Sequence, residues 1–292
     1  MRFRVVHSTR YEYAEPVSLG HNEAHLRPRP APRQICEESH IDIDPRPASL
    51  HERSDYFGNP VAYFALQEPH DALTVVATHV VAVEAPPLPA DLGVSAPWDR
   101  VRDRLDAEIS TAASEARELT LESPMVPLGP HLAEYAAPSF PPGRPLLDAA
   151  YDFTRRMHRE FVYEKNFTTV ATPVLEVLAQ RRGVCQDFAH VAVGCLRSLG
   201  IPARYVSGYI ESAAPAGHAG VRGADASHAW VSVYDPDLGW VDFDPTNDQI
   251  VGARHVTVAW GRDYGDVTPL KGVVFGGGAH TLEVAVELTR LD

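Results

Sequence analysis

The segment that decides the fold of the second half of this chain is Arg181-Arg-Gly-Val-Cys-Gln-Asp-Phe-Ala-His-Val-Ala-Val-Gly-Cys-Leu-Arg-Ser-Leu-Gly200. Its apolar side chains recur at the three- and four-residue spacing of a helix with one buried face: Phe188, Ala192, Cys195 and Leu199. Gly200 and Pro202 are residues that end helices. The pattern therefore predicts a buried helix over residues 185–199.

Cys185 is the first residue of this predicted helix. A thiol at a helix N-terminus lies against unpaired backbone N–H groups and the positive end of the helix dipole, which favour the thiolate. Most free cysteines are instead small buried packing residues. We interpret Cys195 and Cys36 in this second way, whereas for Cys185 the helix position alone leaves both interpretations open.

The segments on either side of the helix indicate the fold class. Helical composition precedes it (98–121, 146–161 and 173–180), and strand-like runs follow it (203–210, 228–234, 240–243, 255–260 and 281–288). Helices first and strands later, without alternation, are typical of an α+β domain. The first 85 residues contain only short strand-like runs separated by turn residues, which predicts a small antiparallel β-sandwich. We therefore expect three parts: a β-sandwich (1–85), a proline-rich linker and helical connector (86–145), and the core that carries the helix (146–292).

Two of the later strands carry polar side chains that could act with a thiol. Alternation places His228, Trp230 and Ser232 on one face of their strand, and Trp240, Asp242 and Asp244 on one face of the next. An acidic side chain beside an imidazole fixes its tautomer and stabilises its cation. Taken singly, a histidine is more often structural, and an aspartate before proline more often begins a turn. Together with Cys185 they are the set that a thiol nucleophile requires.

Four ordered segments extend this argument by resemblance. Gly183-Val-Cys-Gln-Asp-Phe-Ala-His190, Arg197–Tyr209, Ser227-His-Ala-Trp-Val231 and Gly239-Trp-Val-Asp-Phe-Asp-Pro-Thr246 resemble those of the bacterial transglutaminase-like proteins. The similarity covers roughly residues 146–246. The run Tyr56-Phe-Gly-Asn-Pro60 is similar to the N-terminal β domain that accompanies this family.

The resemblance implies a papain- or transglutaminase-like core, in which a cysteine-bearing helix packs on an antiparallel sheet. It implies Cys185 as nucleophile, His228 as base and Asp244, the aspartate before Pro-Thr, as orienting acid. Asp242 is the alternative acid. The implied reaction is acyl transfer on an amide bond of a peptide or protein. The backbone N–H of Cys185 is one natural oxyanion donor, and Tyr163 is the candidate for the second, although core packing explains Tyr163 equally well.

Several alternatives stay open on sequence alone. Water as acceptor would make the protein a cysteine peptidase or amidase, which we favour, and an amine would make it a cross-linking enzyme. A non-catalytic binding module could keep the same fold. Cys185, Asp187 and His190 could instead form a metal site, although Asp187 at the helix start and His190 as a packing residue are the simpler interpretation. Residues 261–269 resemble the family's closing loop and could either border the site or form a turn-rich connector. We expect the loop 213–226 to move.

Composition narrows the classes of partner. The chain has 26 basic and 39 acidic side chains and a net charge of −13, which disfavours nucleic acid. Its three cysteines form no CxxC pair, so we expect neither a disulfide framework nor a structural metal, and no cofactor. The start lacks the apolar stretch of a signal peptide, and no run of about 18 apolar residues suggests a membrane span. We expect a cytoplasmic protein; the oligomeric state is not determined by these features.

Overall fold

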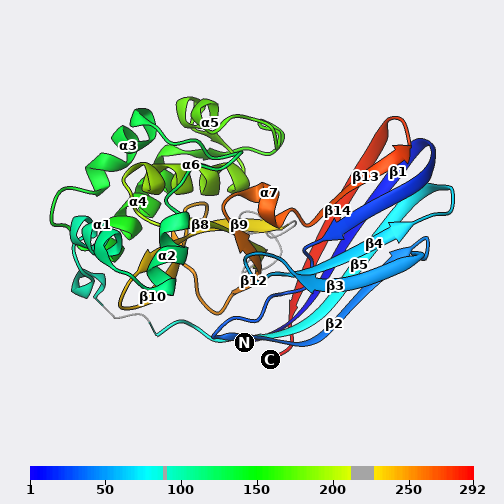
Figure 1. Cartoon of the computed structure of the whole chain (residues 1–292), viewed down its shortest axis with the longest axis horizontal. Coiled ribbons are helices and arrows are strands. Elements are labelled where there is room, and N and C mark those ends of the chain that lie inside the picture. Colours follow the sequence, from blue (N-terminus) through cyan, green and yellow to red (C-terminus); the bar gives the residue numbers. More distant parts are fainter. Residues whose placement is uncertain (88–90, 212–226) are drawn as a thin grey trace, which may run out of the picture.

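The computed structural model describes residues 1–87, 91–211 and 227–292. Two domains lie side by side: an elongated β domain that contains both chain ends, and a domain of helices packed on a sheet (Figure 1). The predicted α+β class, with a strand-rich N-terminal region, is confirmed.

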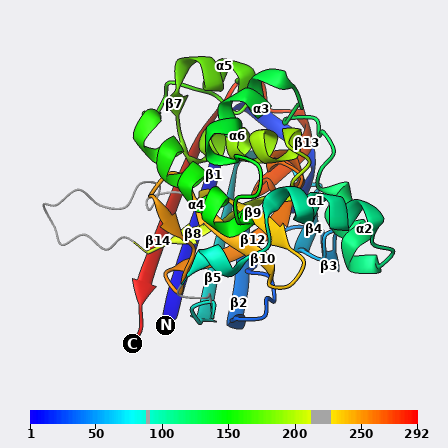
Figure 2. The same cartoon turned by 90° about the vertical axis from the view of Figure 1, so that its left-hand side faces the viewer.

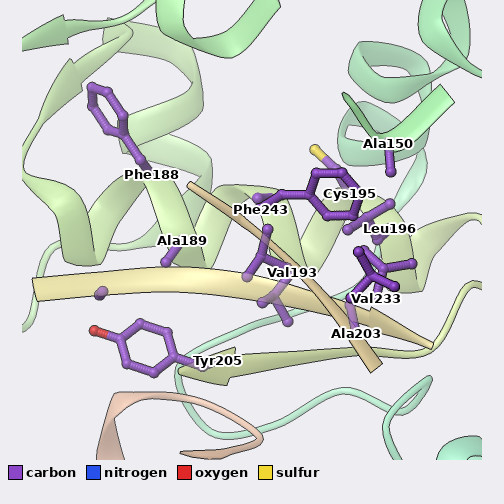
Figure 3. Close-up of a cluster of buried hydrophobic side chains, with 14 of the residues drawn as sticks. Ala150, Phe188, Ala189, Val193, Cys195, Leu196, Ala203, Tyr205, Val233 and Phe243 are labelled. Carbon is purple, nitrogen blue, oxygen red and sulfur yellow. The ribbon is translucent and has the colours of Figure 1, made fainter. Parts of the chain in front are cut away.

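The second domain is built on a five-stranded antiparallel sheet in the order β11-β10-β9-β8-β12. Its strands are β8 (Ala203–Ile210), β9 (His228–Asp235), β10 (Gly239–Asp244), β11 (Gln249–Ile250) and β12 (His255–Gly261). Helix α6 (Cys185–Ser198) lies across one face of this sheet, as the sequence predicts. Apolar side chains of α6 meet those of the strands at the centre of the domain (Figure 3): Ala189, Val193 and Leu196 against Tyr205, Val233 and Phe243.

The remaining helices cover α6 on the side away from the sheet or pack around it (Figure 2). They are η1 (Leu92–Val94), α1 (Trp98–Ala107), α2 (Thr111–Glu118), α3 (Pro130–Ala136), η2 (Ala137–Ser139), α4 (Leu146–Glu160), α5 (Val174–Gln180) and α7 (Tyr264–Val267), with short strands β6 (Val162–Tyr163) and β7 (Arg182–Gly183). Residues of α1, α2 and α3 belong to the same buried core as α6. The segment that we interpreted as a connector is therefore, from Trp98 onward, part of the second domain.

The first domain is a seven-stranded antiparallel sheet arranged around one long strand, β1 (Arg2–Ala24). The first half of β1 lies between β5 (His70–Val83) and β14 (His280–Arg290), and its second half lies between β4 (Pro60–Leu66) and β13 (Leu270–Gly276). Strands β2 (Gln34–Asp44) and β3 (Ser49–Ser54) extend the two halves. Side chains from both halves, including Phe64 and Val75, enclose a second, smaller core.

The turn between β13 and β14 lies opposite residues 14–16 of β1, where the regular pairing of β1 is interrupted. Gly276, Gly277 and Gly278 have φ values of 94°, 83° and 60°, a backbone region that other residues rarely adopt. The backbone N–H of Ala14 donates to the carbonyl of Ala279 over 2.8 Å, which joins this turn to the interrupted part of β1.

The pairing of β13 and β14 with β1 corrects the predicted domain boundaries. We assigned residues 146–292 to the core, but residues 270–290 complete the first domain, and the two termini lie together (Figure 1). The backbone N–H of Leu291 donates to the carbonyl of Arg2 over 2.8 Å. Alternation along 281–288 reveals a strand but not its partner, because strand pairing is a tertiary choice.

Two buried amide side chains join the first domain to the edge strand β12. Gln34 accepts from the backbone N–H of Thr257 over 2.8 Å and donates to its carbonyl over 2.6 Å. Asn59 pairs in the same way with Trp260, over 3.0 and 2.8 Å. These side chains satisfy backbone groups that an exposed edge strand would leave unpaired. The first domain is thus docked on the sheet that carries the site.

Candidate active site

Cys185 lies at the first position of α6, as the sequence predicts, and only 8% of it is exposed. The Asp187 carboxylate accepts hydrogen bonds from the backbone N–H of Val184, over 2.8 Å, and from the hydroxyl of Thr168, over 2.6 Å. A Cβ atom at Gly183 would collide with this carboxylate, which explains the glycine two residues before the thiol. Asp187 thus stabilises the tight entry into the helix and holds Cys185 in place.

His228 and Asp244 form a buried hydrogen-bonded pair at the ends of β9 and β10. Nε2 of His228 donates to Oδ2 of Asp244 over 2.8 Å, and both side chains are sealed from solvent. Burial alone would lower the pKa of His228, but the charge and hydrogen bond of Asp244, with a contribution from Cys185, raise it to about 10. Burial alone would raise the pKa of Asp244, and the same pairing holds it well below its usual range. The pair is therefore an imidazolium and a carboxylate near neutral pH.

The turn after β10 explains why Asp244 is the aspartate that meets His228. Its Oδ1 accepts from the backbone N–H groups of Thr246 and Asn247 over 3.0 and 3.3 Å, and its Oδ2 accepts from Nδ2 of Asn247 over 2.8 Å. Asp242, the alternative, accepts instead from Nε1 of Trp230 over 3.0 Å. Asn247 follows directly on the motif that we quoted, and its amide could have been found there.

The thiol of Cys185 lies at the start of β9. Its Sγ is 3.9 Å from the carbonyl oxygen of Ser227, the residue before His228. Since Asp244 occupies Nε2 of His228, the nitrogen that remains is Nδ1, a buried atom without a hydrogen-bond partner among the described residues. The interaction with Cys185 is one of the causes that raise the pKa of His228. Helix α6 and two strands thus bring together a thiol, an imidazole and a carboxylate.

A second histidine, His255, which we did not single out in the sequence, meets the same carboxylate. Its Nε2 is 3.4 Å from Oδ2 of Asp244, and burial lowers its pKa, so this ring is neutral. Trp230 packs edge-on against His255 with ring centroids 5.4 Å apart. Gly208, on the strand between, leaves room for that indole, because a Cβ there would lie 2.5 Å from it.

Ligand atoms of His228, Asp244 and His255 all lie within 4.8 Å of one another, which is also a metal-like grouping. Two ligands of a tetrahedral zinc, each about 2.1 Å from the ion, would be about 3.4 Å apart. Nε2 of His228 and Oδ2 of Asp244 are 2.8 Å apart, the distance of a direct charge-assisted hydrogen bond. This geometry fits an oriented imidazole better than a metal site.

In the other possible metal site, which the sequence suggested at Cys185, Asp187 and His190, the last two side chains bind other partners. Asp187 caps the helix start, as described above. Nε2 of His190 accepts from the backbone N–H of Tyr264 over 3.1 Å, and its ring packs 4.9 Å from that of Tyr205. His190 therefore positions α7, in agreement with the packing role that we expected of it.

Residues 261–269, which could border the site or form a connector, form the end of β12 and α7 beside Cys185. Burial raises the pKa of Tyr264, and the nearby Tyr11 and Cys185 raise it further. Tyr163, on β6, pairs with Gly183 of β7 and packs against Phe188. The loop 213–226 lies outside the described residues. Over the residues that are described, no helix is both long and apolar enough to cross a membrane.

Comparison with known proteins assigns this arrangement to a family. The sequence matches the bacterial transglutaminase-like N-terminal region over residues 3–82 and the transglutaminase-like superfamily core over residues 135–245. An uncharacterised protein of Mycobacterium tuberculosis is 39% identical over 298 residues, covering 100% of this chain and 93% of the relative. The chain belongs to the transglutaminase-like superfamily.

Two further proteins show how far the similarity extends. A protein-glutamine gamma-glutamyltransferase of Pseudomonas aeruginosa is 38% identical over 92 residues, which is 30% of this chain and 14% of that protein. The crystal structure of a protein from Cytophaga hutchinsonii, provisionally assigned as a cysteine protease, superposes with a TM-score of 0.74. It covers 100% of this chain and 91% of its own at 19% identity, which confirms the fold.

Proposed function

We propose that this protein is a thiol enzyme that transfers acyl groups from amide bonds of peptides or proteins, with Cys185 as nucleophile, His228 as acid and base, and Asp244 as orienting acid. One observation carries the proposal. The 2.8 Å bond from Nε2 of His228 to Asp244 leaves Nδ1 on the side of the thiol, and Cys185 begins a helix. Thiolate, imidazolium and carboxylate in this order are the set for covalent acyl transfer.

The reaction follows from these positions. The Cys185 thiolate attacks the amide carbonyl, and the negative charge moves onto the carbonyl oxygen, which backbone N–H groups in the first turn of α6 can stabilise. The raised pKa of His228 makes it a proton donor, and it protonates the leaving amine as the C–N bond breaks. A thioester on Cys185 remains. His228, now neutral, removes a proton from the acceptor that resolves the thioester.

We further propose water as the acceptor, which makes the protein a cysteine peptidase or amidase. This preference rests on the cytoplasmic location inferred from the sequence, because cross-linking would damage a cell's own interior. Cell fractionation tests the location. The second candidate is transfer to an amine, as the name of the Pseudomonas aeruginosa relative describes for that protein.

Acylation and its resolution can be measured in one experiment. The protein is incubated with a peptide library containing glutamine in ¹⁸O-labelled water, with and without a fluorescent primary amine, and products are identified by mass spectrometry. Hydrolysis incorporates ¹⁸O, and transfer incorporates the amine. Cys185→Ala should abolish both, whereas Cys195→Ser, a change in the same helix, should preserve them.

A chemical test of the nucleophile does not need the natural substrate. p-Nitrophenyl acetate should release a burst of nitrophenolate and leave one acetyl group on Cys185, located by peptide mapping. A folded protein whose Cys185 is neither acetylated nor active on any peptide would contradict the proposal. The fold would then serve as a non-catalytic binding module.

A further inference from the structure

A large cavity lies between the two domains, on the face of the second sheet opposite α6. Its volume is about 1000 Å³. Residues from both domains line it, among them Arg29, Phe57, Arg204, Trp240 and Trp260. Cys185, His228 and Asp244 do not line it, so this cavity is separate from the thiol site.

Arg204 reaches the inner wall of this cavity without a hydrogen bond or ion pair to any described residue. Only 7% of the residue is exposed, and its Nε is sealed without a partner. Its Cζ lies 3.6 Å from the ring centroid of Trp260 and 4.3 Å from that of Trp240. The guanidinium is therefore held flat against aromatic rings, with its donors unused.

Arg29 brings a second guanidinium to the same place. It too is 7% exposed, its Cζ lies 3.1 Å from the ring centroid of Trp260, and its Nε has no partner. Within the part of the chain that the structure describes, only Nη1 is paired, with the carbonyl of Phe57 over 3.1 Å and with Oδ1 of Asn59 over 2.5 Å. Burial lowers the pKa of Arg204 to about 9 and that of Arg29 to about 10, so both are still cations at neutral pH.

No described residue forms an ion pair with Arg204 or Arg29 at this inner end. Asp55 raises the pKa of Arg29, but its carboxylate accepts from Asn59 and lies 3.4 Å from Nε2 of His25 instead. Asp242 is the acidic neighbour that raises the pKa of Arg204, but it forms no ion pair with it and binds Trp230 instead. The other acidic residues of the cavity are exposed at its rim: Glu84, Glu115, Glu118 and Asp237. Removing a charge from water costs free energy, which a cation–π contact offsets only in part. Two buried cations with unused donors are thus suited to an anion.

We propose that this cavity binds a small organic anion, whose carboxylate or phosphate group is held by Arg204 and Arg29. A planar guanidinium donates two parallel hydrogen bonds to either oxyanion, so both groups fit the same chemistry. Trp240, Pro86 and Pro87 provide apolar surface for the body of the ligand. The cavity also reaches His255, whose other side meets Asp244, so an occupant lies one side chain from the thiol site.

The full-length protein can be tested with benzoate, phenyl phosphate and the uncharged benzyl alcohol. Binding is followed by calorimetry and by tryptophan fluorescence, since Trp240 and Trp260 line the cavity. At least one anion should bind saturably and the alcohol should not. Comparison of the two anions, which share a phenyl body, shows whether carboxylate or phosphate is preferred.

Arg204→Gln should weaken anion binding by about tenfold or more, because charge-assisted hydrogen bonds are lost. Arg204→Lys should retain part of the affinity, and the exposed Arg53→Gln should bind as wild type. Arg29→Gln provides a second variant if Arg204→Gln does not fold. Absence of saturable binding of either anion to the wild type, or undiminished binding in a folded Arg204→Gln or Arg29→Gln protein, would overturn the proposal.

Discussion

Replacing Asp244 by Asn tests whether the carboxylate keeps His228 charged beside Cys185. The change preserves the shape of the side chain and removes its charge. Oδ2 accepts the 2.8 Å bond from His228, and its negative charge is the main cause that opposes burial of the imidazolium. Without it the effect of burial remains, which lowers the pKa of the ring. We therefore expect a neutral His228 at pH 7 in the variant.

The size of the expected effect on Cys185 labelling follows from the shift in the pKa of His228. The pKa of His228 rises from 6.5 to about 10. At 1.36 kcal/mol per unit, this corresponds to roughly 5 kcal/mol in favour of the cation. If a third of this energy also favours attack by the neighbouring sulfur of Cys185, the rate of its labelling changes about tenfold. The expected loss of thiol reactivity is thus easily measured.

The assay is labelling of Cys185 by iodoacetamide between about pH 5 and pH 9, read by mass spectrometry. An ordinary thiol, with a pKa near 8.5, is labelled slowly at about pH 6.5. Wild-type Cys185 should react rapidly there, and Asp244→Asn should react at least about tenfold more slowly. Asp242→Asn is the matched control, because it removes a carboxylate from the same strand. Cys195, fully buried, is the internal reference.

The pair also has a defined pH window in stability. The raised pKa of His228 gives stability that is complete below about pH 6.5 and is lost as the pH rises through about 10. The lowered pKa of Asp244 gives stability that is present above about pH 3.9 and is lost on acidification. The difference in unfolding free energy between wild type and Asp244→Asn should be largest between about pH 3.9 and about pH 6.5, where both contributions are present. An unchanged labelling profile in a folded Asp244→Asn protein would refute the reasoning.

Three further perturbations test the structure around the site. Burial lowers the pKa of three histidines to about 4, so stability that is present above pH 6.5 should fall steeply toward pH 4 in urea unfolding: His7, His79 and His190. His7→Gln should reduce that slope, and the exposed His131→Gln should leave it unchanged. Gly183→Ala forces its Cβ into Asp187 and should lower the free energy of unfolding by about 1–3 kcal/mol, whereas Gly252→Ala, with open space around it, should change it little; equal melting temperatures would contradict this assignment. Asn59→Ala leaves two backbone groups of Trp260 unpaired and should cost about 2–4 kcal/mol in thermal unfolding, unless the domains are not docked as described.

Local pattern was sufficient for the elements that carry the site. The buried stripe and the glycine at its end predict α6, and alternation predicts β9 with His228 and β10 with Asp244. These features depend on neighbours within a few residues, where helical and strand periodicity operate. The choice of Asp244 over Asp242 came from family resemblance, and the turn formed with Asn247 supplies its physical reason.

Contacts between distant segments were decided by the tertiary structure. Strands 270–276 and 280–290 have the same alternation whichever sheet they join, so their return to β1 could not be predicted from their own residues. His255 on β12 meets Asp244 on β10, although β9 and β8 lie between these two strands in the sheet. No pattern within either strand predicts that contact. Arg29 and Arg204 belong to different domains and share Trp260 only after docking. Periodicity records which side of an element is buried, whereas the partner that buries it depends on how the whole chain packs.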